Sequence, residues 1–400
     1  MGRLLTSFVL LILCAAAALM LVISPSSTLA QILGIAKDVP VETVPTVQME
    51  SVTESTAPET TVVTEATIPE TTEATEPETT VPETTEATEA PTEPTPQVFT
   101  LTFVGNCTLG TSQKNYNYQQ GFIQTVGEDY TYNFANVIDY FDGDDFTMLN
   151  LEGVLADEAK SSGKEYAYCG PSAYVNILSQ NSVEAVSLSN NHTMDFLEDG
   201  YRTTTSNLTD AGVSYVEQDK TMIFTTDSGL TIGMYAVNID NLKEEAIVAA
   251  ISELKANAAV DLVVFAPHWG NDTAYTANAT QKDLAYAAID AGADIVYGTH
   301  PYVLQPIEVY KGSVIYYSLG NFAFGGNNSP KDYNTALVQQ EVIRNADGTI
   351  KLGKLTVVPC SLSSVTGRND FRPTPYEVGS TGYTNVLSKL KVQDAVVSIG

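Results

Sequence analysis

Residues 292–310, GADIVYGTHPYVLQPIEVY, show which class of fold this chain adopts. The run ADIVYGTH (293–300) is a short and almost continuous apolar segment that ends in Gly, Thr and His. Such a run is typical of a buried strand in a sheet that is covered on both faces. A helical pattern over 280–291 precedes it. Because a strand directly follows a helix, the stretch predicts an α/β architecture.

The same alternation extends in both directions from this stretch. The remaining β-rich runs lie at 98–105, 145–153, 183–192, 230–238 and 261–270, and the helical patterns lie at 134–141, 172–180, 198–211 and 243–257. Toward the C-terminus, residues 303–324 predict a hairpin around Lys311-Gly312, and strand-like runs follow at 335–343 and 350–358. These late strands favour mixed sheets over a purely parallel sheet.

The N-terminal segment reads as a membrane signal. After Arg3 come twenty residues without a charge, which at 1.5 Å per residue could cross a hydrocarbon core of about 30 Å. We expect residues 1–30 to form a membrane anchor, with the rest of the chain outside the cell membrane. Cleavage after Ala30, which would release a secreted protein, stays open as an alternative.

Residues 31–97 are rich in Thr, Glu and Pro and repeat the tetrapeptide PETT. This composition cannot bury enough apolar surface to order the chain, so we expect a disordered stalk. Residues 98–400 then hold the folded domain. The whole chain carries a formal net charge of −29, which argues against nucleic acid as a partner.

All three histidines of the chain follow predicted strands. They are His192 in SNNHTMD, His268 in APHWG and His300 in YGTHPY. Glu152 in NLEG and Asn106 in VGNC follow strands in the same way. Open α/β sheets bind ligands beyond the carboxyl ends of their strands. Imidazole, carboxylate and amide groups that converge there are suitable ligands for a divalent metal ion.

These blocks resemble a known family. VGNCTLG, NLEG, SNNHTMD, HWG, GADIVYGTHPYVLQPIEVY and YSLGNFAF are similar, in this order, to the CapA-type poly-γ-glutamate capsule biosynthesis proteins of the calcineurin-like metallophosphoesterase superfamily. The resemblance runs from about residue 99 to residue 375. It implies a four-layer α/β/β/α sandwich of two mixed sheets. It also implies an accessory role in the synthesis of a capsule or another envelope polymer.

The resemblance assigns roles by position. One metal position of the superfamily matches residues that are all present, namely Glu152, Asn191, His268 and His300. The other position would need an Asp and a His where this chain has Asn106 and Tyr302. Neutral Asn and Tyr are weak ligands, so the resemblance implies one divalent ion (Mn, Zn or Fe) and no second metal. His192 matches the general acid of the superfamily, and Asp195 is placed to orient it.

Two functions follow from this pattern. The first is a membrane-anchored, extracytoplasmic accessory protein of capsule assembly, whose partners are the cell membrane, other capsule-synthesis subunits and an anionic polymer. The second is an active surface phosphoesterase, a metal-dependent phosphoric ester hydrolase. The substitutions at Asn106 and Tyr302 favour the first, because efficient hydrolysis needs two cations to activate water.

Two further residue types leave alternatives open. Tyrosines cluster at 116, 118, 130, 132, 166 and 168 in two long insertions, and they could grip a polymer or simply fill the surface. The only evident cations for an anionic polymer are a bound metal and Lys114, Lys164 and Arg202. Cys107 and Cys360 could form a disulfide or remain buried thiols.

Overall fold

The computed structural model of the chain describes residues 95–239 and 243–399. The predicted membrane segment and nearly all of the predicted stalk lie outside these residues. Among the described helices, none is both long and apolar enough to cross a membrane. The first described strand, β1 (Gln97–Thr108), begins one residue before the predicted domain boundary at Val98.

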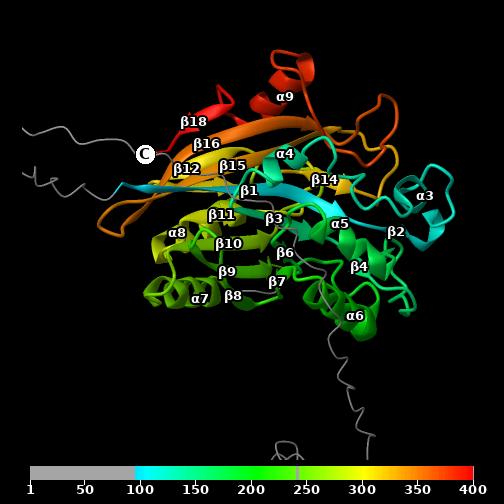
Figure 1. Ribbon diagram of the computed structural model, residues 1–400, viewed down its shortest axis with the longest axis horizontal. Coiled ribbons are helices and arrows are strands. Elements are labelled where there is room, and N and C mark those ends of the chain that lie inside the picture. The colour runs from blue at the N-terminus through cyan, green and yellow to red at the C-terminus, as the bar shows by residue number, and fades with distance from the viewer. Residues whose placement is uncertain (1–94, 240–242, 400) are drawn as a thin grey trace, which may run out of the picture. The chain divides into compact units, whose positions relative to one another are not determined.

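The larger sheet has nine strands and is built around β1, the long cyan strand in Figure 1. β1 pairs in parallel with β3 (Phe146–Leu151) and in antiparallel with β15 (Asn334–Arg344). At its carboxyl end β1 pairs in parallel with β14 (Asn321–Phe324). The sheet is completed by β6 (Ala185–Ser187) and β7 (Ser214–Val216) on the β3 side, and by β16 (Ile350–Ser361), β17 (Thr374–Pro375) and β18 (Val396–Ser398) on the β15 side.

The second sheet has six strands in the order β12-β13-β11-β10-β9-β8. Its four central strands run parallel and its two edge strands run antiparallel to their neighbours. The strands are β8 (Lys220–Thr225), β9 (Thr231–Asn238), β10 (Leu262–His268), β11 (Ile295–Tyr297), β12 (Ile307–Tyr310) and β13 (Ser313–Tyr316). A third, small sheet contains β2 (Thr111–Ser112), β4 (Val154–Leu155) and β5 (Tyr168–Gly170).

The two large sheets pack face to face, as the alternation of side chains along each strand shows. In β10, Leu262, Val264 and Ala266 belong to an apolar cluster that also contains Leu101 and Phe103 of β1. The intervening residues of β10 belong to a different cluster, formed with two helices. Because successive side chains of a strand point to opposite faces, each sheet buries one face against the other sheet and one face against helices.

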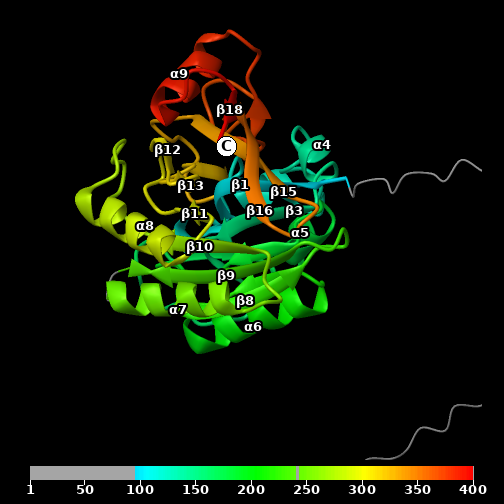
Figure 2. The same ribbon diagram turned by 90° about the vertical axis from the view of Figure 1, so that its left-hand side faces the viewer.

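Helices cover both outer faces. α7 (Glu244–Ala256) and α8 (Ala279–Ala291) pack on the second sheet. The larger sheet is covered by shorter elements: α3 (Phe122–Val126), α4 (Ile138–Phe141), α5 (Asn176–Ser179) and α6 (Leu197–Asp210), with a 3-10 turn at Ser172–Val175. Another 3-10 turn, Gln113–Asn115, directly follows β2. Figure 2 shows α7 and α6 along one side of the domain and α9 (Thr381–Leu390) on the opposite side, where it packs on β15 and β16.

The structure confirms an α/β chain with mixed sheets, and it corrects one prediction. The hairpin pairs β12 with β13 and continues to a bridge between Leu304 and Leu319. Its turn residues Lys311 and Gly312 both have positive φ (52° and 86°), as a tight two-residue hairpin turn requires. The residues after Leu319 do not extend this hairpin. Instead β14 crosses to the larger sheet and pairs with β1. The correction matters because this crossing brings Asn321 beside Asn106.

The crossing depends on a close approach between two glycines. A side chain on Gly105 would place its Cβ 2.0 Å from the carbonyl oxygen of Gly320, which is closer than atoms can approach. That same carbonyl accepts a hydrogen bond from the backbone N–H of Asn106 at 2.9 Å. The Gly-Asn pairs at 105–106 and 320–321 therefore face one another and hold the two strand ends together.

Two carboxyl groups beside the start of β3, Asp144 in the preceding turn and Glu184 directly before β6, have pKa values that are raised by burial. The pKa of Asp144 rises to about 7, and that of Glu184 is also raised. Both contact Thr147: its hydroxyl donates to Asp144 at 2.7 Å, and its backbone N–H donates to Glu184 at 2.6 Å. The folded protein thus holds these protons more tightly than the unfolded chain, so folding stability rises as the pH falls from about 7 toward 4.

We therefore predict that Asp144→Asn, which mimics the protonated acid, stabilises the protein at pH 8. The thermal midpoint should rise by about 2 °C, the shift that roughly 1 kcal/mol produces in a domain of this size. The gain should disappear at pH 4, where Asp144 of the wild type is already protonated. Thermal unfolding at both pH values measures this, and Asp139→Asn, the same charge change at an exposed position, is the control. An equal gain from Asp139→Asn would show that net charge alone is responsible.

Candidate functional site

The predicted site residues meet where strands of both large sheets end. Asn106 lies in β1 and Glu152 directly follows β3. His268 is the last residue of β10, and His300 and Tyr302 follow β11. The loop after β6 adds Asn191, His192 and Asp195. All eight predicted residues are linked by the contacts described below, although their chemical roles stay predictions.

Glu152 is the buried carboxylate of the site. Its side chain is fully buried, and Oε1 accepts a hydrogen bond from the Tyr302 hydroxyl at 3.1 Å. His192 Nε2 lies 3.7 Å from the same oxygen. Oε2 has no hydrogen-bond partner among the described residues. Burial raises the pKa of Glu152 to about 7, opposed by His192 and by the Tyr302 hydrogen bond. A buried carboxylate oxygen without a partner is an unsatisfied acceptor that a cation would stabilise.

His268 pairs with Asn191 across the two sheets. Its Nε2 lies 3.0 Å from Asn191 Oδ1, and its Nδ1 lies 3.0 Å from Thr299 Oγ1. Burial, with His300 and His192 nearby, lowers the pKa of His268 well below its usual value, so the ring is neutral at physiological pH. When Nδ1 donates its proton to Thr299, the lone pair of Nε2 faces the amide oxygen of Asn191. A cation between two such acceptors would take the place of a bridging proton.

His300 and Tyr302 are held in unusual backbone conformations. Their φ angles are 102° and 63°, in the region that favours glycine, on either side of Pro301. Such strain costs about 1–3 kcal/mol per residue and is found mainly at functional sites. His300 Nε2 lies 3.1 Å from Asp272 Oδ1, and the rings of His300 and His268 are 4.7 Å apart. Desolvation and the nearby Glu152 raise the pKa of Tyr302, so its hydroxyl stays protonated.

His192 is fixed by a buried acid. Its Nδ1 lies 2.6 Å from Oδ2 of Asp195, whose side chain is fully buried. Asp195 also accepts hydrogen bonds from the Tyr168 backbone N–H at 2.8 Å and from Lys164 Nζ at 3.1 Å. The Tyr168 ring packs on the imidazole with the ring centres 4.5 Å apart. Nε2 of His192 is thereby aimed at Glu152, the orientation that an acid or a base needs to transfer a proton at this position.

Four asparagines form a chain of buried amides beneath these side chains. Asn190 Nδ2 donates to Asn150 Oδ1 at 3.0 Å, and Asn150 Nδ2 donates to Asn106 Oδ1 at 3.0 Å. Asn106 Nδ2 then donates to Asn321 Oδ1 at 3.2 Å. The strand register explains two of the three links, because Asn106 pairs with Asn150 in β3 and with Asn321 in β14. The chain therefore ties together the ends of neighbouring strands.

This amide chain determines what Asn106 can bind. Its side-chain oxygen already accepts from Asn150 and, at 3.4 Å, from the backbone N–H of His300. A carbonyl oxygen has two lone pairs, so both are used. Tyr302, the other substituted residue, donates its hydroxyl proton to Glu152. Asn106 and Tyr302, the two residues at the predicted second cation position, thus form hydrogen bonds with other residues of the protein.

The predicted metal ligands do not form a complete set in the described structure. Within residues 95–239 and 243–399, no three His, Cys, Asp or Glu side chains lie close enough together to hold a metal ion. The predicted ligands His268, His300, Glu152 and Asn191 therefore stay a prediction, although they suit a cation by chemical type. Two imidazoles, a carboxylate and an amide oxygen match the donors that Mn, Zn or Fe accept.

Sequence reasoning missed several residues of the site. Asp272 contacts His300, and Thr299 contacts His268. Asn150 donates to Asn106, and Asn190 donates to Asn150. The motifs contained the signal, because Asn150 precedes Glu152 in NLEG and Asn190 precedes Asn191 in SNN. The register between strands, which the sequence does not give, decides that they touch.

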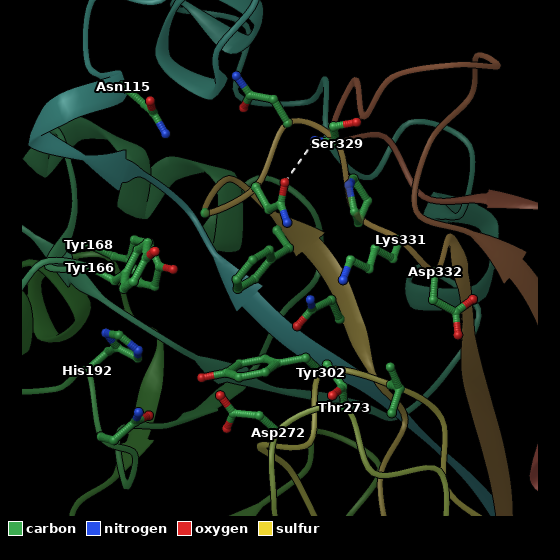
Figure 3. A pocket seen from close by; sticks show the side chains of 18 of the residues that line it. Asn115, Tyr166, Tyr168, His192, Asp272, Thr273, Tyr302, Ser329, Lys331 and Asp332 are labelled. Carbon is green, nitrogen blue, oxygen red and sulfur yellow. Dashed lines mark hydrogen bonds between the residues drawn. The ribbon is translucent and has the colours of Figure 1, made fainter.

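A cavity of about 1050 Å³ opens beside the site (Figure 3). Of the predicted tyrosine clusters, Tyr118, Tyr166 and Tyr168 line it, whereas Tyr130 and Tyr132 pack against the core beneath the larger sheet. Of the predicted cations, Lys164 reaches Asp195, while Lys114 and Arg202 form exposed ion pairs elsewhere. The three described cysteines, at 107, 169 and 360, are free.

Residues 100–326 match the model of the family described as bacterial capsule synthesis protein PGA_cap. Among curated proteins, the chain is 29% identical over 317 residues to the PGA biosynthesis protein CapA of Bacillus subtilis (strain 168), covering 73% of this chain and 78% of that protein. It is 29% identical over 302 residues to the capsule biosynthesis protein CapA of Bacillus anthracis, covering 68% and 70%. It is also 24% identical over 208 residues to a probable polyglutamine synthesis accessory protein of Mycobacterium tuberculosis (strain ATCC 25618 / H37Rv), covering 44% and 55%.

Two solved structures show weaker similarity. A hypothetical protein from Thermus thermophilus has a TM-score of 0.40 at 15% identity, covering 65% of this chain and 99% of that chain. The NAD nucleotidase of Haemophilus influenzae has a TM-score of 0.38 at 10% identity, covering 75% and 64%. Both TM-scores lie below 0.5, so neither similarity establishes a shared function.

We predict that Asn150→Ala lowers the free energy of unfolding by about 2–4 kcal/mol. The change leaves the Asn106 oxygen and the Asn190 amide with one partner fewer in a buried setting, where each such loss costs about 1–3 kcal/mol. Denaturant unfolding measures the difference. Asn136→Ala, which removes one exposed hydrogen bond to Thr374, should stay within about 0.5 kcal/mol of the wild type. A cost below about 1 kcal/mol for Asn150→Ala would mean that the amide chain does not support the site.

Proposed function

The chain belongs to the bacterial capsule synthesis protein family PGA_cap, and from this premise we propose that it is an accessory protein of envelope-polymer assembly with a site for one divalent cation. The single observation that carries this proposal is the internal bonding of Asn106 and Tyr302. A two-cation centre would need both of these positions to supply ligands. Because Asn106 and Tyr302 already bond to other residues, a second cation has no ligands there. The site can then hold and polarise a ligand but is poorly equipped to activate water.

The relatives support the accessory role. One is named a PGA biosynthesis protein, another a capsule biosynthesis protein and a third a probable polyglutamine synthesis accessory protein. We extend this role to the present chain and propose a poly-γ-glutamate-like or other envelope polymer, together with further capsule-synthesis subunits, as its partners. The apolar run after Arg3 would anchor the chain, with the folded domain outside the membrane.

The fold is consistent with the same proposal. The two mixed sheets pack face to face, helices lie on both outer faces, and the candidate site residues lie at the strand ends. The resemblance to calcineurin-like metallophosphoesterases implies this arrangement. We infer that this chain keeps the fold while its site has diverged. His268, His300, Asn191 and Glu152 would hold the cation, which would act as a Lewis acid toward an oxygen of the ligand. Asp272, bonded to His300, would keep that imidazole oriented.

A second candidate function rests on a different observation. The His192–Asp195 pair is buried, short and aimed at Glu152, which is how a general acid of a phosphoesterase would be arranged. An active surface metallophosphoesterase, acting on an extracytoplasmic phosphoester, is therefore the alternative. The two functions differ in turnover, because only the enzyme should hydrolyse a generic aryl phosphate at about 1 s⁻¹ or faster.

The proposal is tested by two measurements made together. Deletion of the gene in its host should lower the amount of surface polymer, and the wild-type gene should restore it. The purified protein should not hydrolyse an aryl phosphate in the presence of Mn²⁺ or Zn²⁺. Hydrolysis at an ordinary enzymatic rate would establish the second candidate instead, and an unchanged amount of polymer would contradict the accessory role.

We predict that the double variant Asn106→Asp with Tyr302→His binds a second cation and gains phosphoesterase activity. The carboxylate supplies an anionic oxygen, and the imidazole replaces a hydroxyl that now bonds to Glu152. Calorimetric titration with Mn²⁺ should give two ions per chain for the variant and one for the wild type.

Each single change serves as a control, because one new ligand alone should not bind the second ion. Fluorescence of Trp269 gives an independent readout, since this buried residue directly follows His268 and donates to the Tyr317 carbonyl. If the double variant titrates with the wild-type stoichiometry, the site has changed in shape as well as in ligands.

A further inference from the structure

The cavity beside the site is larger than a cation needs. Its volume of about 1050 Å³ lies just above the range of about 300–1,000 Å³ that is typical of small-molecule sites. Figure 3 shows His192, Tyr302 and Asp272 toward one end, Tyr166 and Tyr168 on a neighbouring side, and Lys331 and Asp332 on the far side. The space is therefore suited to several units of a chain, with one end at the candidate cation site.

Aromatic rings form a large part of its wall and are exposed to solvent. Tyr118, Tyr166 and Tyr275 have 49%, 59% and 46% of their surface exposed, although aromatic residues are usually more deeply buried. Tyr275 is held in place by a 3.0 Å hydrogen bond from its hydroxyl to Asp332. Exposed rings that gather around one cavity indicate a surface on which a ligand stacks.

The charges of the wall do not suit a polyanion. Asp272 and Asp332 are both acidic, and Lys331 is the only lysine or arginine among the described residues that line the cavity. Asp332 already pairs with Lys389 at 2.6 Å, and Asp272 lies against His300. An anionic polymer with one charge per unit would need several cations along its path, and this wall offers one.

Neutral amides are a recurring polar group of the wall. Asn115, Asn321, Asn327 and Asn328 line the cavity, and an amide both donates and accepts hydrogen bonds without carrying charge. Asn369 fixes the loop that carries two of them, because its Nδ2 donates to the carbonyl of Asn327 at 3.0 Å and its N–H donates to the carbonyl of Asn328 at 2.9 Å. The amides are therefore presented by an ordered loop.

We propose that this cavity binds an uncharged glycan chain, with sugar rings stacked on Tyr118, Tyr166 and Tyr275 and with hydroxyl or N-acetyl groups bonded to the asparagines. Sugar rings have apolar faces that stack on aromatic rings, and their edges carry neutral donors and acceptors. This inference rests on the proposed accessory function and narrows it, since it makes a neutral glycan of the envelope, rather than the anionic polymer, the ligand of this cavity.

The test is a calorimetric titration of the full-length protein with two probes of matched length. The first is a tetramer of β-1,4-linked N-acetylglucosamine, and the second is a γ-linked tetramer of glutamate. The neutral tetramer should bind, and its affinity should change little between low and high NaCl because no charge is neutralised.

Tyr166→Ala should weaken binding of the neutral tetramer by about fivefold to tenfold through loss of a stacking ring. Tyr116→Ala is the matched control: this tyrosine is 46% exposed and only two residues from Tyr118, but it does not line the cavity.

Three results would overturn the inference. These are tighter, salt-sensitive binding of the glutamate tetramer, binding of neither probe at millimolar concentration, and equal losses from Tyr166→Ala and Tyr116→Ala. Each of them leaves the accessory function standing, because that function is judged by the amount of surface polymer and by the absence of phosphoester hydrolysis.

Discussion

A chain of four buried amides holds the strand ends of the larger sheet in place, and the chemistry of the site depends on it. Asn190, Asn150, Asn106 and Asn321 are joined in this order, each to the next by one hydrogen bond. A buried amide without partners is costly, so the chain fixes the loop after β6, the ends of β1 and β3, and the start of β14 relative to one another. The Asn106 oxygen also accepts from the His300 backbone N–H at 3.4 Å, so both of its hydrogen bonds are made within the fold.

The parts of the site outside this chain contain groups that a cation would stabilise. His268 is neutral because it is buried, and Glu152 has an oxygen without a hydrogen-bond partner among the described residues. His300 is held in a strained conformation by the contact of its ring with Asp272 and by its backbone N–H, which donates to Asn106. One half of the site thus has a polar oxygen without a partner among the described residues, and the other half is closed by internal hydrogen bonds. The proposed function rests on this asymmetry, because the closed half offers no free acceptor for a second cation.

The sequence predicted much of this arrangement and missed its decisive contacts. Apolar patterns predicted the main strands and helices, and the helical pattern at 280–291 corresponds to α8 (Ala279–Ala291). The positions of the histidines at strand ends predicted that they would meet. The crossing of β14 into the larger sheet was not predicted, because the apolar run that contains it looks like a continuation of the hairpin. Without that crossing, Asn321 could not be placed beside Asn106, and the closed half of the site could not be recognised.

The number of cations bound by the wild-type protein tests the central claim most directly. Crystals grown with Mn²⁺ and measured at the manganese absorption edge would locate each ion by its anomalous scattering. The closed amide chain and the Tyr302–Glu152 hydrogen bond predict one ion per chain, in contact with His268 and Asn191. Two fully occupied ions, one of them in contact with Asn106, would contradict the account.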